Sequence, residues 1–380
     1  MQTKARIEAA LARAVESGAA PGIVAAAVTP ADGAIDVAVG ARGVEDSTPM
    51  DAATVFWIAS CTKAITAAAA LQLVERGQLS LDEPVAGRLP TLASPKVLTG
   101  FDADGAPKTR PAKGPITARH LLTHTSGLAY DFCNADLTKY FAATGTSLFG
   151  AETPDIPLIF DPGERWQYGI GLDWTGKLIE AVSGQRLDHY MDEHIFAPLG
   201  MADTSFFPVE AHAARKAGMH GRRPDGGLDP ASFGMPPAPH FGMGGGGLYS
   251  TAPDYLRFLG AILADGAPIL GAEGMALMRG DQVGEMSAGF LKSAQPMMSN
   301  DFDPFPGCRT GWSCGFGINT APGPAGRATG SLMWGGLANC YYWADPTRGV
   351  AGVFLSQVLP FADPRILAAF ADFERAVYGG

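Results

Sequence analysis

Strand-forming segments stand at both ends of this 380-residue chain, and the block between them is patterned for helices. Residues 22–28 and 34–40 have the composition of strands and flank the turn residues 29–33, which predicts a β-hairpin. Strand character returns only beyond residue 310, in segments 313–319, 339–344 and 350–357, followed by an amphipathic helix at about 363–377. One antiparallel sheet assembled from both ends, with a helical lobe inserted, accounts for this distribution economically.

The inserted block carries helix signals and long loops from about residue 60 to residue 300. A turn at residues 102–105 precedes a Pro- and Lys-rich loop that runs to Gly114. Helices are expected near 117–123, 173–183, 186–196 and 253–264. We therefore predict an α/β (α+β) fold with a single domain over residues 1–380, in which 1–55 plus 310–380 form a sheet-and-helix lobe and 60–300 form a mostly helical lobe.

Composition narrows the class of protein. A hydrophobic content of 47%, a charged content of 17% and 49 glycines are typical of a compact globular chain. The formal net charge of −10 argues against nucleic acid or an anionic membrane as partner. The N-terminus begins an amphipathic helix and not a signal peptide, and no window reaches the length of a membrane span. Five irregularly spaced cysteines are then best explained as reduced thiols in a cytoplasmic protein, and the sequence carries no signal for an oligomeric state.

The segment that carries the most chemistry is Ser60-Cys61-Thr62-Lys63, at the head of an almost wholly apolar run. The pattern predicts a core helix that begins near Ser60, is capped by Gly77, and holds Lys63 on the face of Ser60. Burial lowers the pKa of a lysine toward that of a general base, and a serine within its reach is an activated nucleophile. The alternative is a serine N-cap followed by a lysine whose amine reaches the surface. We favour catalysis because the chain contains no other S-x-x-K.

A competing pattern, Gly311-Trp312-Ser313-Cys314-Gly315, has the form G-x-S-x-G. In α/β-hydrolases this pentapeptide leads from a strand into a helix, and a histidine follows later in the chain. Residues 316–324 are too rich in proline and glycine for a helix, and the last histidine is His240, so we reject Ser313 as nucleophile. His120 and His124 stand four apart without a third-ligand pattern, and we expect neither a metal nor a cofactor.

Further segments follow the S-x-x-K motif in a characteristic order. They are residues 116–128 (ITARHLLTHTSGL), residues 160–168 (FDPGERWQY), residues 244–255, and the tripeptide 334–336 (WGG). In this combination the chain resembles the serine β-lactamase and penicillin-binding-protein superfamily, in particular its class C-like members. Among these it is most similar to the carboxylesterases of bacterial lipolytic family VIII. The resemblance extends from about residue 5 to about residue 375.

The resemblance implies a role for each matching residue. Ser60 would attack the substrate carbonyl, while Lys63 and Tyr168 would share the roles of general base and proton donor. Which of the two is the primary base stays open, because a tyrosine phenol normally titrates near pH 10. The oxyanion hole would consist of the backbone N–H groups of Ser60 and Leu337.

The tripeptide Trp334-Gly335-Gly336 would lie on the strand that flanks the site, where its two glycines are expected to let the substrate approach the backbone. Trp334 stands where β-lactamases carry a lysine, and Ile170 stands where they carry an asparagine. Losing a charge-assisted hydrogen bond costs roughly 1.5–3 kcal/mol of binding. Together with Tyr130, these two side chains would instead suit an uncharged acyl or alcohol group.

We therefore predict a serine carboxylesterase that acts on small to medium uncharged carboxylic esters, with transfer of the acyl group to an alcohol open to the same residues. The partner is a small-molecule ester. Two alternatives stay open from the sequence. One is a class C-like β-lactamase or D-amino peptidase. The other is a non-catalytic binding module of the same fold, although Ser60, Lys63 and Tyr168 are all retained.

Overall fold

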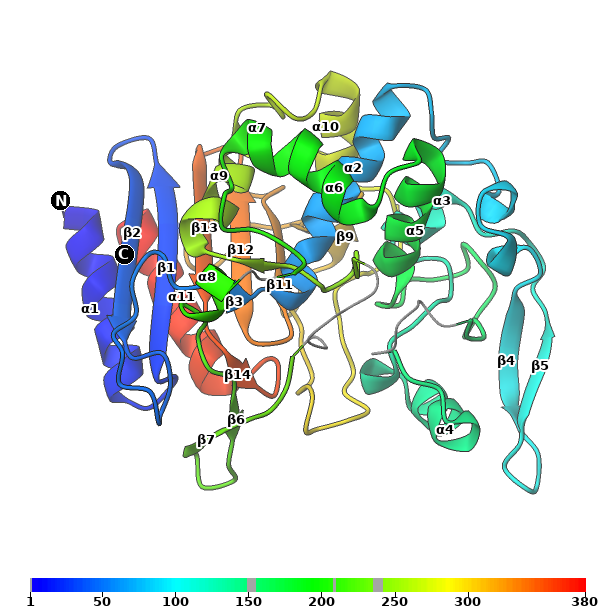
Figure 1. Cartoon of the computed structure of the whole chain (residues 1–380), viewed down its shortest axis with the longest axis horizontal. Helices are drawn as coiled ribbons and strands as arrows, with labels where there is room; N and C mark the ends of the chain where they lie inside the picture. The colour runs from blue at the N-terminus through cyan, green and yellow to red at the C-terminus, as the bar shows by residue number, and fades with distance from the viewer. Residues whose placement is uncertain (1, 149–154, 208–209, 235–241) are drawn as a thin grey trace.

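The computed structural model describes residues 2–148, 155–207, 210–234 and 242–380. At its centre is a seven-stranded sheet in the order β2-β1-β13-β12-β11-β10-β9, in which every neighbouring pair is antiparallel. The C-terminal strands are β9 (Thr310–Trp312), β10 (Gly317–Asn319), β11 (Leu332–Gly336), β12 (Cys340–Asp345) and β13 (Val350–Leu355). The N-terminal hairpin of β1 (Gly22–Thr29) and β2 (Gly33–Gly40) joins them through β1 and β13. The prediction of one antiparallel sheet built from both ends of the chain is confirmed (Figure 1).

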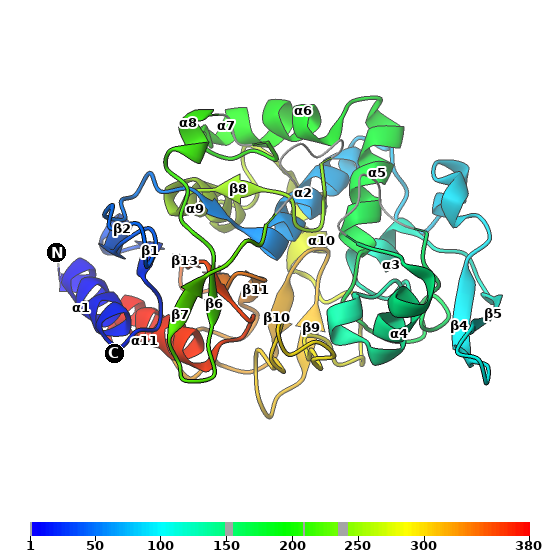
Figure 2. The ribbon, with the colours of Figure 1, turned by 60° about the horizontal axis from the view of Figure 1, so that its bottom comes forward.

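Helices cover both faces of this sheet. On one face, α1 (Gln2–Glu16) packs against α11 (Pro364–Tyr378), so the first and last helices lie side by side (Figure 2). On the other face, α9 (Ala252–Leu263) packs against β1, β12 and β13. Successive side chains of β12 illustrate the division, because alternate residues of a strand point to opposite faces. Tyr341 stacks on Phe370 of α11, and Tyr342 contacts Tyr255 of α9.

The inserted block carries most of the helices of the described chain, joined by long loops. Its central element is α2 (Thr62–Glu75), which packs against α5 (Gly171–Ser183) and α10 (Ala272–Arg279). The predicted helices correspond to α3 (Ala118–Leu122), α5, α6 (Leu187–Met191) with the π-helical turn Asp192–Phe196, and α9. The lobe also contains α4 (Ala135–Thr144), α7 (Ala197–Leu199) and α8 (Glu210–Ala213). Within the described residues, no helix combines the length and the apolarity needed to cross a bilayer.

Two sequence predictions were wrong. The segment 313–319 is not one strand, because the chain reverses at Ser313–Phe316 between β9 and β10, with Gly315 at a φ of +116°. The Pro- and Lys-rich segment between the turn at residues 102–105 and Gly114 was predicted to be a loop. It contains β5 (Pro107–Pro111), which pairs with β4 (Lys96–Phe101) as a projecting hairpin (Figure 1). Two small sheets complete the fold. One pairs β3 (Phe56–Trp57) with β8 (Tyr249–Ser250), and the other contains β14 (Val358–Leu359), β6 (His220–Arg222) and β7 (Leu228–Pro230).

Candidate active site

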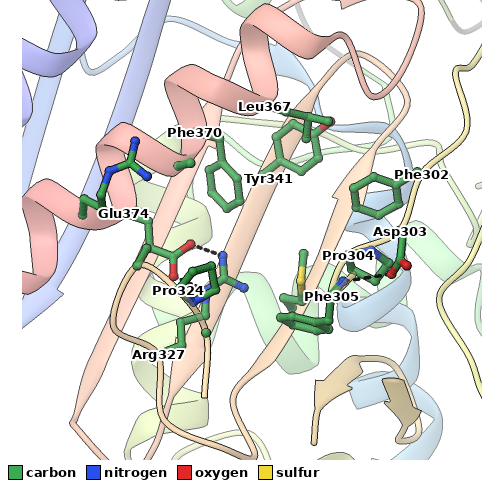
Figure 3. A pocket seen from close by; sticks show the side chains of 15 residues that line it. Phe302, Asp303, Pro304, Phe305, Pro324, Arg327, Tyr341, Leu367, Phe370 and Glu374 are labelled. Atoms are coloured by element: carbon green, nitrogen blue, oxygen red, sulfur yellow. Dashed lines mark hydrogen bonds and ion pairs between the residues drawn. The ribbon is translucent and has the colours of Figure 1, made fainter. Parts of the chain in front are cut away.

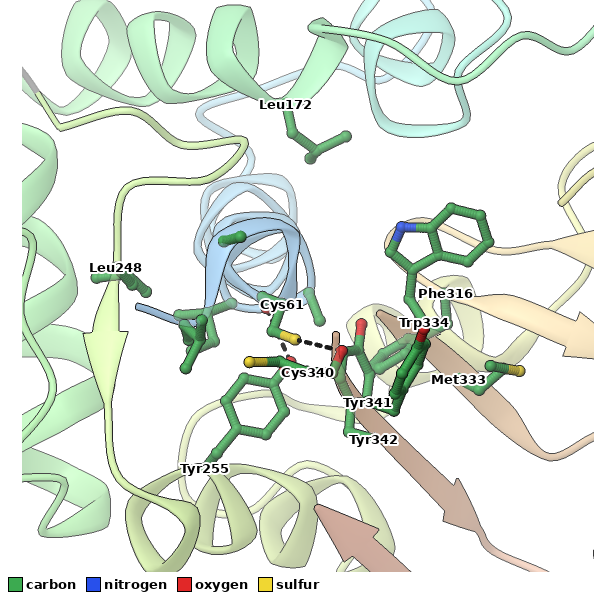
Figure 4. Close-up of a cluster of buried hydrophobic side chains, with 14 of the residues drawn as sticks. Cys61, Leu172, Leu248, Tyr255, Phe316, Met333, Trp334, Cys340, Tyr341 and Tyr342 are labelled. Carbon is green, nitrogen blue, oxygen red and sulfur yellow. Dashed lines mark hydrogen bonds between the residues drawn. The ribbon is translucent and has the colours of Figure 1, made fainter. Parts of the chain in front are cut away.

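The start of α2 is held against β11, near Gly336, by a short turn. Residues Ala59–Cys61 form a single 3-10 turn before α2, and Ala59 adopts a φ of +45°. A non-glycine residue in this region carries strain of about 1–3 kcal/mol, which the surrounding packing must offset. The Tyr255 hydroxyl donates to the Cys61 carbonyl over 2.8 Å, and the Thr62 hydroxyl donates to the Ala59 carbonyl over 2.6 Å. Figure 4 shows this packing, with Cys61 facing Cys340 and Tyr255 below the helix. The turn presents Ser60 at the surface of a pocket.

Lys63 is sequestered as the sequence predicted, with 1% of its surface exposed. Its Nζ lies 3.2 Å from the Ser60 Oγ, 3.0 Å from the Tyr130 hydroxyl and 2.6 Å from the Gly245 carbonyl oxygen. Burial lowers the pKa of Lys63 from 10.5 to about 8, and the Asp173 carboxylate opposes part of that fall. A lysine in this state supplies a useful fraction of free amine near neutral pH.

The partners of Lys63 determine where its hydrogens point. A carbonyl can only accept, so Gly245 takes one N–H. The Tyr130 hydroxyl donates to the Asp173 Oδ2 over 3.3 Å, so its oxygen takes a second N–H from Lys63. A neutral amine has two hydrogens and one lone pair, and the third direction is occupied by Ser60. The neutral lysine therefore accepts the hydrogen of the Ser60 hydroxyl without any rearrangement.

Asp173 fixes this arrangement from α5. Its side chain is buried, its Oδ1 accepts from the Gly245 N–H over 2.9 Å, and its Oδ2 accepts from Tyr130. Burial raises the pKa of Asp173, while the Lys63 ammonium and the Gly245 N–H oppose the rise. A Cβ at residue 245 would lie 2.3 Å from Asp173 Oδ2, so only glycine fits there. The one residue Gly245 thus contacts Lys63 through its carbonyl and Asp173 through its amide.

Tyr168 lies beside Tyr130 at the same site, with 5.3 Å between the two ring centroids. It is 2% exposed, its hydroxyl oxygen accepts from the Trp334 Nε1–H over 3.1 Å, and its ring centroid lies 4.8 Å from Lys63 Nζ. Burial raises the pKa of Tyr168 strongly, and hydrogen bonds with Ser60 and Trp334 only partly offset this. Because Trp334 can only donate, the phenolic hydrogen of Tyr168 is free to face Ser60. Tyr168 is therefore a protonated phenol, suited to donating a proton.

The pocket at Ser60 is narrow and mostly apolar. Its lining residues are Ser60, Phe132, Tyr168, Leu291, Trp334, Gly335, Leu337 and Phe361. Ser60 and Leu337, the two residues expected to supply oxyanion-hole N–H groups, both lie at this pocket. In the part of the chain that the structure describes, neither N–H donates to another protein group. Both N–H groups are thus available to a ligand.

Other predicted site residues have different surroundings. Ile170 is buried at the start of α5 and is absent from the described lining of the pocket, because its position after Tyr168 directs it into the lobe core. Gly336 is likewise absent from the described lining, and a Cβ there would lie 2.2 Å from the Ile58 carbonyl oxygen. At Gly335 a Cβ would lie 2.8 Å from the Tyr341 ring. Both glycines therefore let β11 approach its neighbours, and Gly335 also lines the active-site pocket. Tyr130 lies at the site, with its hydroxyl on Lys63.

The rejected motifs serve structural purposes. Ser313 is fully buried in the β9–β10 turn, where its Oγ accepts from the Phe316 N–H over 3.1 Å. His124 is also buried and packs edge-on against Trp312 and beside the Tyr168 ring, at 5.1 and 4.8 Å between centroids. Burial lowers the pKa of His124 far below its usual value, so it is a neutral packing residue behind Tyr168.

Sequence reasoning missed Asp173 and Gly245. One signal for Asp173 was present, since it is an acid within the apolar first turns of a helix. The lining residues Phe132, Leu291 and Phe361 were likewise unassigned to this pocket. They come from three separate loops, which converge only in the folded chain.

Comparisons with known proteins agree with this geometry. The family model described as Beta-lactamase matches residues 7–376. A monacolin J acid methylbutanoyltransferase of Aspergillus terreus is 34% identical over 356 residues, covering 87% of this chain and 83% of that protein. A lovastatin esterase of Penicillium rubens is 33% identical over 341 residues, covering 84% of each.

Among solved structures, unliganded simvastatin synthase LovD from Aspergillus terreus superposes with a TM-score of 0.85 at 31% identity, covering 100% of this chain and 98% of that one. EstCE1, a hydrolase with promiscuous acyltransferase activity, shares the fold with a TM-score of 0.78 at 23% identity, covering 100% of this chain and 99% of that one. The chain therefore belongs to the Beta-lactamase family, within the serine β-lactamase and transpeptidase superfamily.

Proposed function

We propose that the chain is a serine carboxylesterase that acts on small to medium uncharged carboxylic esters through an acyl-enzyme on Ser60. The observation that carries the proposal is the placement of buried Lys63, whose amine is held by Gly245 and Tyr130 so that its third direction meets the Ser60 hydroxyl. The names of the relatives, which include acyltransferases and an esterase, support the same reaction class.

In the proposed acylation, neutral Lys63 takes the proton of Ser60 as the Oγ attacks the ester carbonyl. The lowered pKa of about 8 suits Lys63, and not the strongly buried phenol of Tyr168, to the role of base. The oxyanion would accept hydrogen bonds from the N–H groups of Ser60 and Leu337. When the C–O bond breaks, Tyr168 donates its proton to the leaving alkoxide, and the Lys63 ammonium restores that proton. Water repeats these steps in reverse to release the acid.

The pocket's composition supports an uncharged ester. Trp334 is 1% exposed and uses its indole N–H on Tyr168, so this position offers no cation to a substrate carboxylate. The other walls are contributed by Phe132, Leu291 and Phe361, which are apolar. Such walls stabilise hydrocarbon by roughly 25 cal/mol per Å² of buried area. A β-lactam carboxylate would lose its hydration here without gaining a charged partner.

An alcohol is a second candidate acceptor for the acyl group. The specific support is that an acyltransferase is 34% identical over 87% of this chain. An alcohol would enter deacylation as water does, giving its proton to the same base. Partitioning of the acyl group between water and an added primary alcohol measures this directly.

Initial rates on p-nitrophenyl butyrate and on a chromogenic cephalosporin test the proposed reaction. We expect ester turnover to dominate, to fall at least about 10³-fold in Ser60→Ala, and to be retained in the matched control Ser313→Ala. A fluorophosphonate should label the peptide that contains Ser60. Full activity of Ser60→Ala, a label on Ser313, or dominant cephalosporin turnover would each refute the proposal.

A further inference from the structure

A second pocket lies on the opposite face of β11 from the candidate active site. It has a volume of about 170 Å³ and opens between the loop at residues 302–305, the loop at residues 323–327 and α11 (Figure 3). Met333 faces this pocket, whereas the next residue, Trp334, faces the active-site pocket. Its apolar walls include Phe302, Phe305, Pro324, Met333, Leu367 and Phe370.

One buried polar group in this pocket has no partner. Arg327 has 4% of its side chain exposed and binds Glu374 side-on, through Nε at 2.7 Å and Nη2 at 2.5 Å. Within the described part of the chain, its Nη1 has no hydrogen-bond partner. The side-on pairing turns Nη1 away from Glu374, and Figure 3 shows it directed at the space between Pro324 and Phe305. The guanidinium is also packed against the rings of Trp343 and Phe370, at 5.1 and 5.5 Å.

A buried donor without an acceptor costs free energy, and the pocket beside Nη1 is where an acceptor would fit. A single water is a poor occupant, because a stable buried water needs two to four polar partners and these walls are mostly apolar. The charge of Arg327 is already balanced by Glu374, and Arg375, which also lines the pocket, is paired with Asp372, while Asp303 adds a further carboxylate at the rim. A second anion would be repelled by the carboxylates of Glu374 and Asp303. An uncharged oxygen acceptor would not.

We propose that this pocket is a binding site for an uncharged small molecule that has an apolar body and a carbonyl oxygen. The carbonyl accepts from Arg327 Nη1, and the body packs against Met333 and Phe305. The proposal does not depend on the catalytic roles proposed above, because none of those residues lines this pocket. Phe302 nonetheless connects this pocket with the active-site pocket. Its ring lies 6.1 Å from Trp334 and 5.0 Å from Phe361, both of which line the active-site pocket.

Calorimetric titration of the full chain with 4-phenyl-2-butanone tests the site, with 4-phenylbutyrate as the charged analogue. Ala371 lies half-buried on α11 at the pocket wall, so Ala371→Phe fills the cavity and should weaken ketone binding at least about tenfold. The exposed Ala368 on the same helix provides the control Ala368→Phe, which should bind within about twofold of the unmodified chain. Arg327→Gln replaces the guanidinium by a shorter amide, which takes the Nη1 donor out of reach and should weaken binding about fivefold.

Because Arg327→Gln leaves Glu374 unpaired and can destabilise the fold, the Ala371 and Ala368 pair keeps the test independent of that variant. Saturable ketone binding that Ala371→Phe weakens at least about tenfold, with weaker binding of phenylbutyrate, supports the site. The proposal is overturned if no saturable binding occurs below about 10 mM, if Ala371→Phe binds the ketone as the unmodified chain does, or if phenylbutyrate binds more tightly than the ketone.

Discussion

Replacing Asp173 by Asn should lower the pH at which the base becomes active. Two hydrogen bonds of 3.0 and 3.3 Å through Tyr130 place the Lys63 Nζ within about 6 Å of the Asp173 Oδ2. At an effective dielectric constant of about 20, opposite unit charges at that distance attract by about 2.5–3 kcal/mol. Removal of the carboxylate charge destabilises the Lys63 ammonium by this amount, which lowers the pKa of Lys63 by about two.

The assay is the pH dependence of kcat/KM for p-nitrophenyl butyrate between about pH 5 and pH 10, which reports groups of the free enzyme. The unmodified chain should lose activity below a midpoint near 8, the pKa of Lys63. Asp173→Asn should move this midpoint to about 6. Asn is nearly isosteric, so it can still accept from the Gly245 N–H.

The matched control is Asp192→Asn, which removes one negative charge from an exposed position. Solvent screening should keep its midpoint within about 0.3 of the unmodified value. An Asp173→Asn midpoint that stays in place or rises would show that the carboxylate does not set the basicity of Lys63. Circular dichroism and the denaturation midpoint of the variant establish that it is folded.

Three further predictions concern stability. Gly336→Ala should destabilise the fold by about 3 kcal/mol in urea denaturation, because the added Cβ would lie 2.2 Å from the Ile58 carbonyl oxygen. A stability within about 0.5 kcal/mol of that of the unmodified chain would contradict this packing. Gly260→Ala, in α9 with no atom within 4 Å of the added Cβ, should stabilise by about 1 kcal/mol in the same assay, and a loss would contradict the open space described there. Lys63 has a lower pKa folded than unfolded, so the unfolded chain binds more protons between about pH 8 and 10.5, and stability rises with pH in that window by about 3 kcal/mol. Lys63→Met should remove this rise, so denaturation curves of the two chains that keep a constant difference from pH 7.5 to about pH 10.5 would refute the assignment.

The sheet and the pair of Ser60 and Lys63 could be predicted from sequence because their signals are local. Apolar runs bounded by turn residues locate β1 and β2, and an unbroken apolar helix predicts that Lys63 is buried. The β9–β10 turn was hidden because the run around Ser313 is apolar on both sides of the reversal. The β4–β5 hairpin was hidden because β5 has no fully buried residue and so shows no alternation of apolar and polar positions.

The environment of Lys63 could not be predicted in the same way. Its partners Tyr130 and Gly245 lie 67 and 182 residues further along the chain, and no periodicity relates such distant positions. Asp173 is linked to Lys63 through Tyr130 and Gly245, so its effect on the amine depends on tertiary structure alone. The glycines of β11 show the opposite difficulty. Their pattern suggested access for a substrate, and Gly335 does line the pocket, but close contacts with Ile58 and Tyr341 also require glycine at these two positions.

The pairing of β1 with β13 has a consequence for biosynthesis. Val24 finds its partner in Leu355, so the N-terminal hairpin emerges from the ribosome with one edge unpaired and waits for more than 300 further residues. At about 5–20 residues per second this delay is roughly 15–65 seconds. During that time β1 exposes a row of unpaired amide and carbonyl groups beside apolar side chains, which favours association between nascent chains. Translation speed and chaperone capacity in the expression host should therefore affect the yield of folded protein more strongly than they affect the stability of the finished fold.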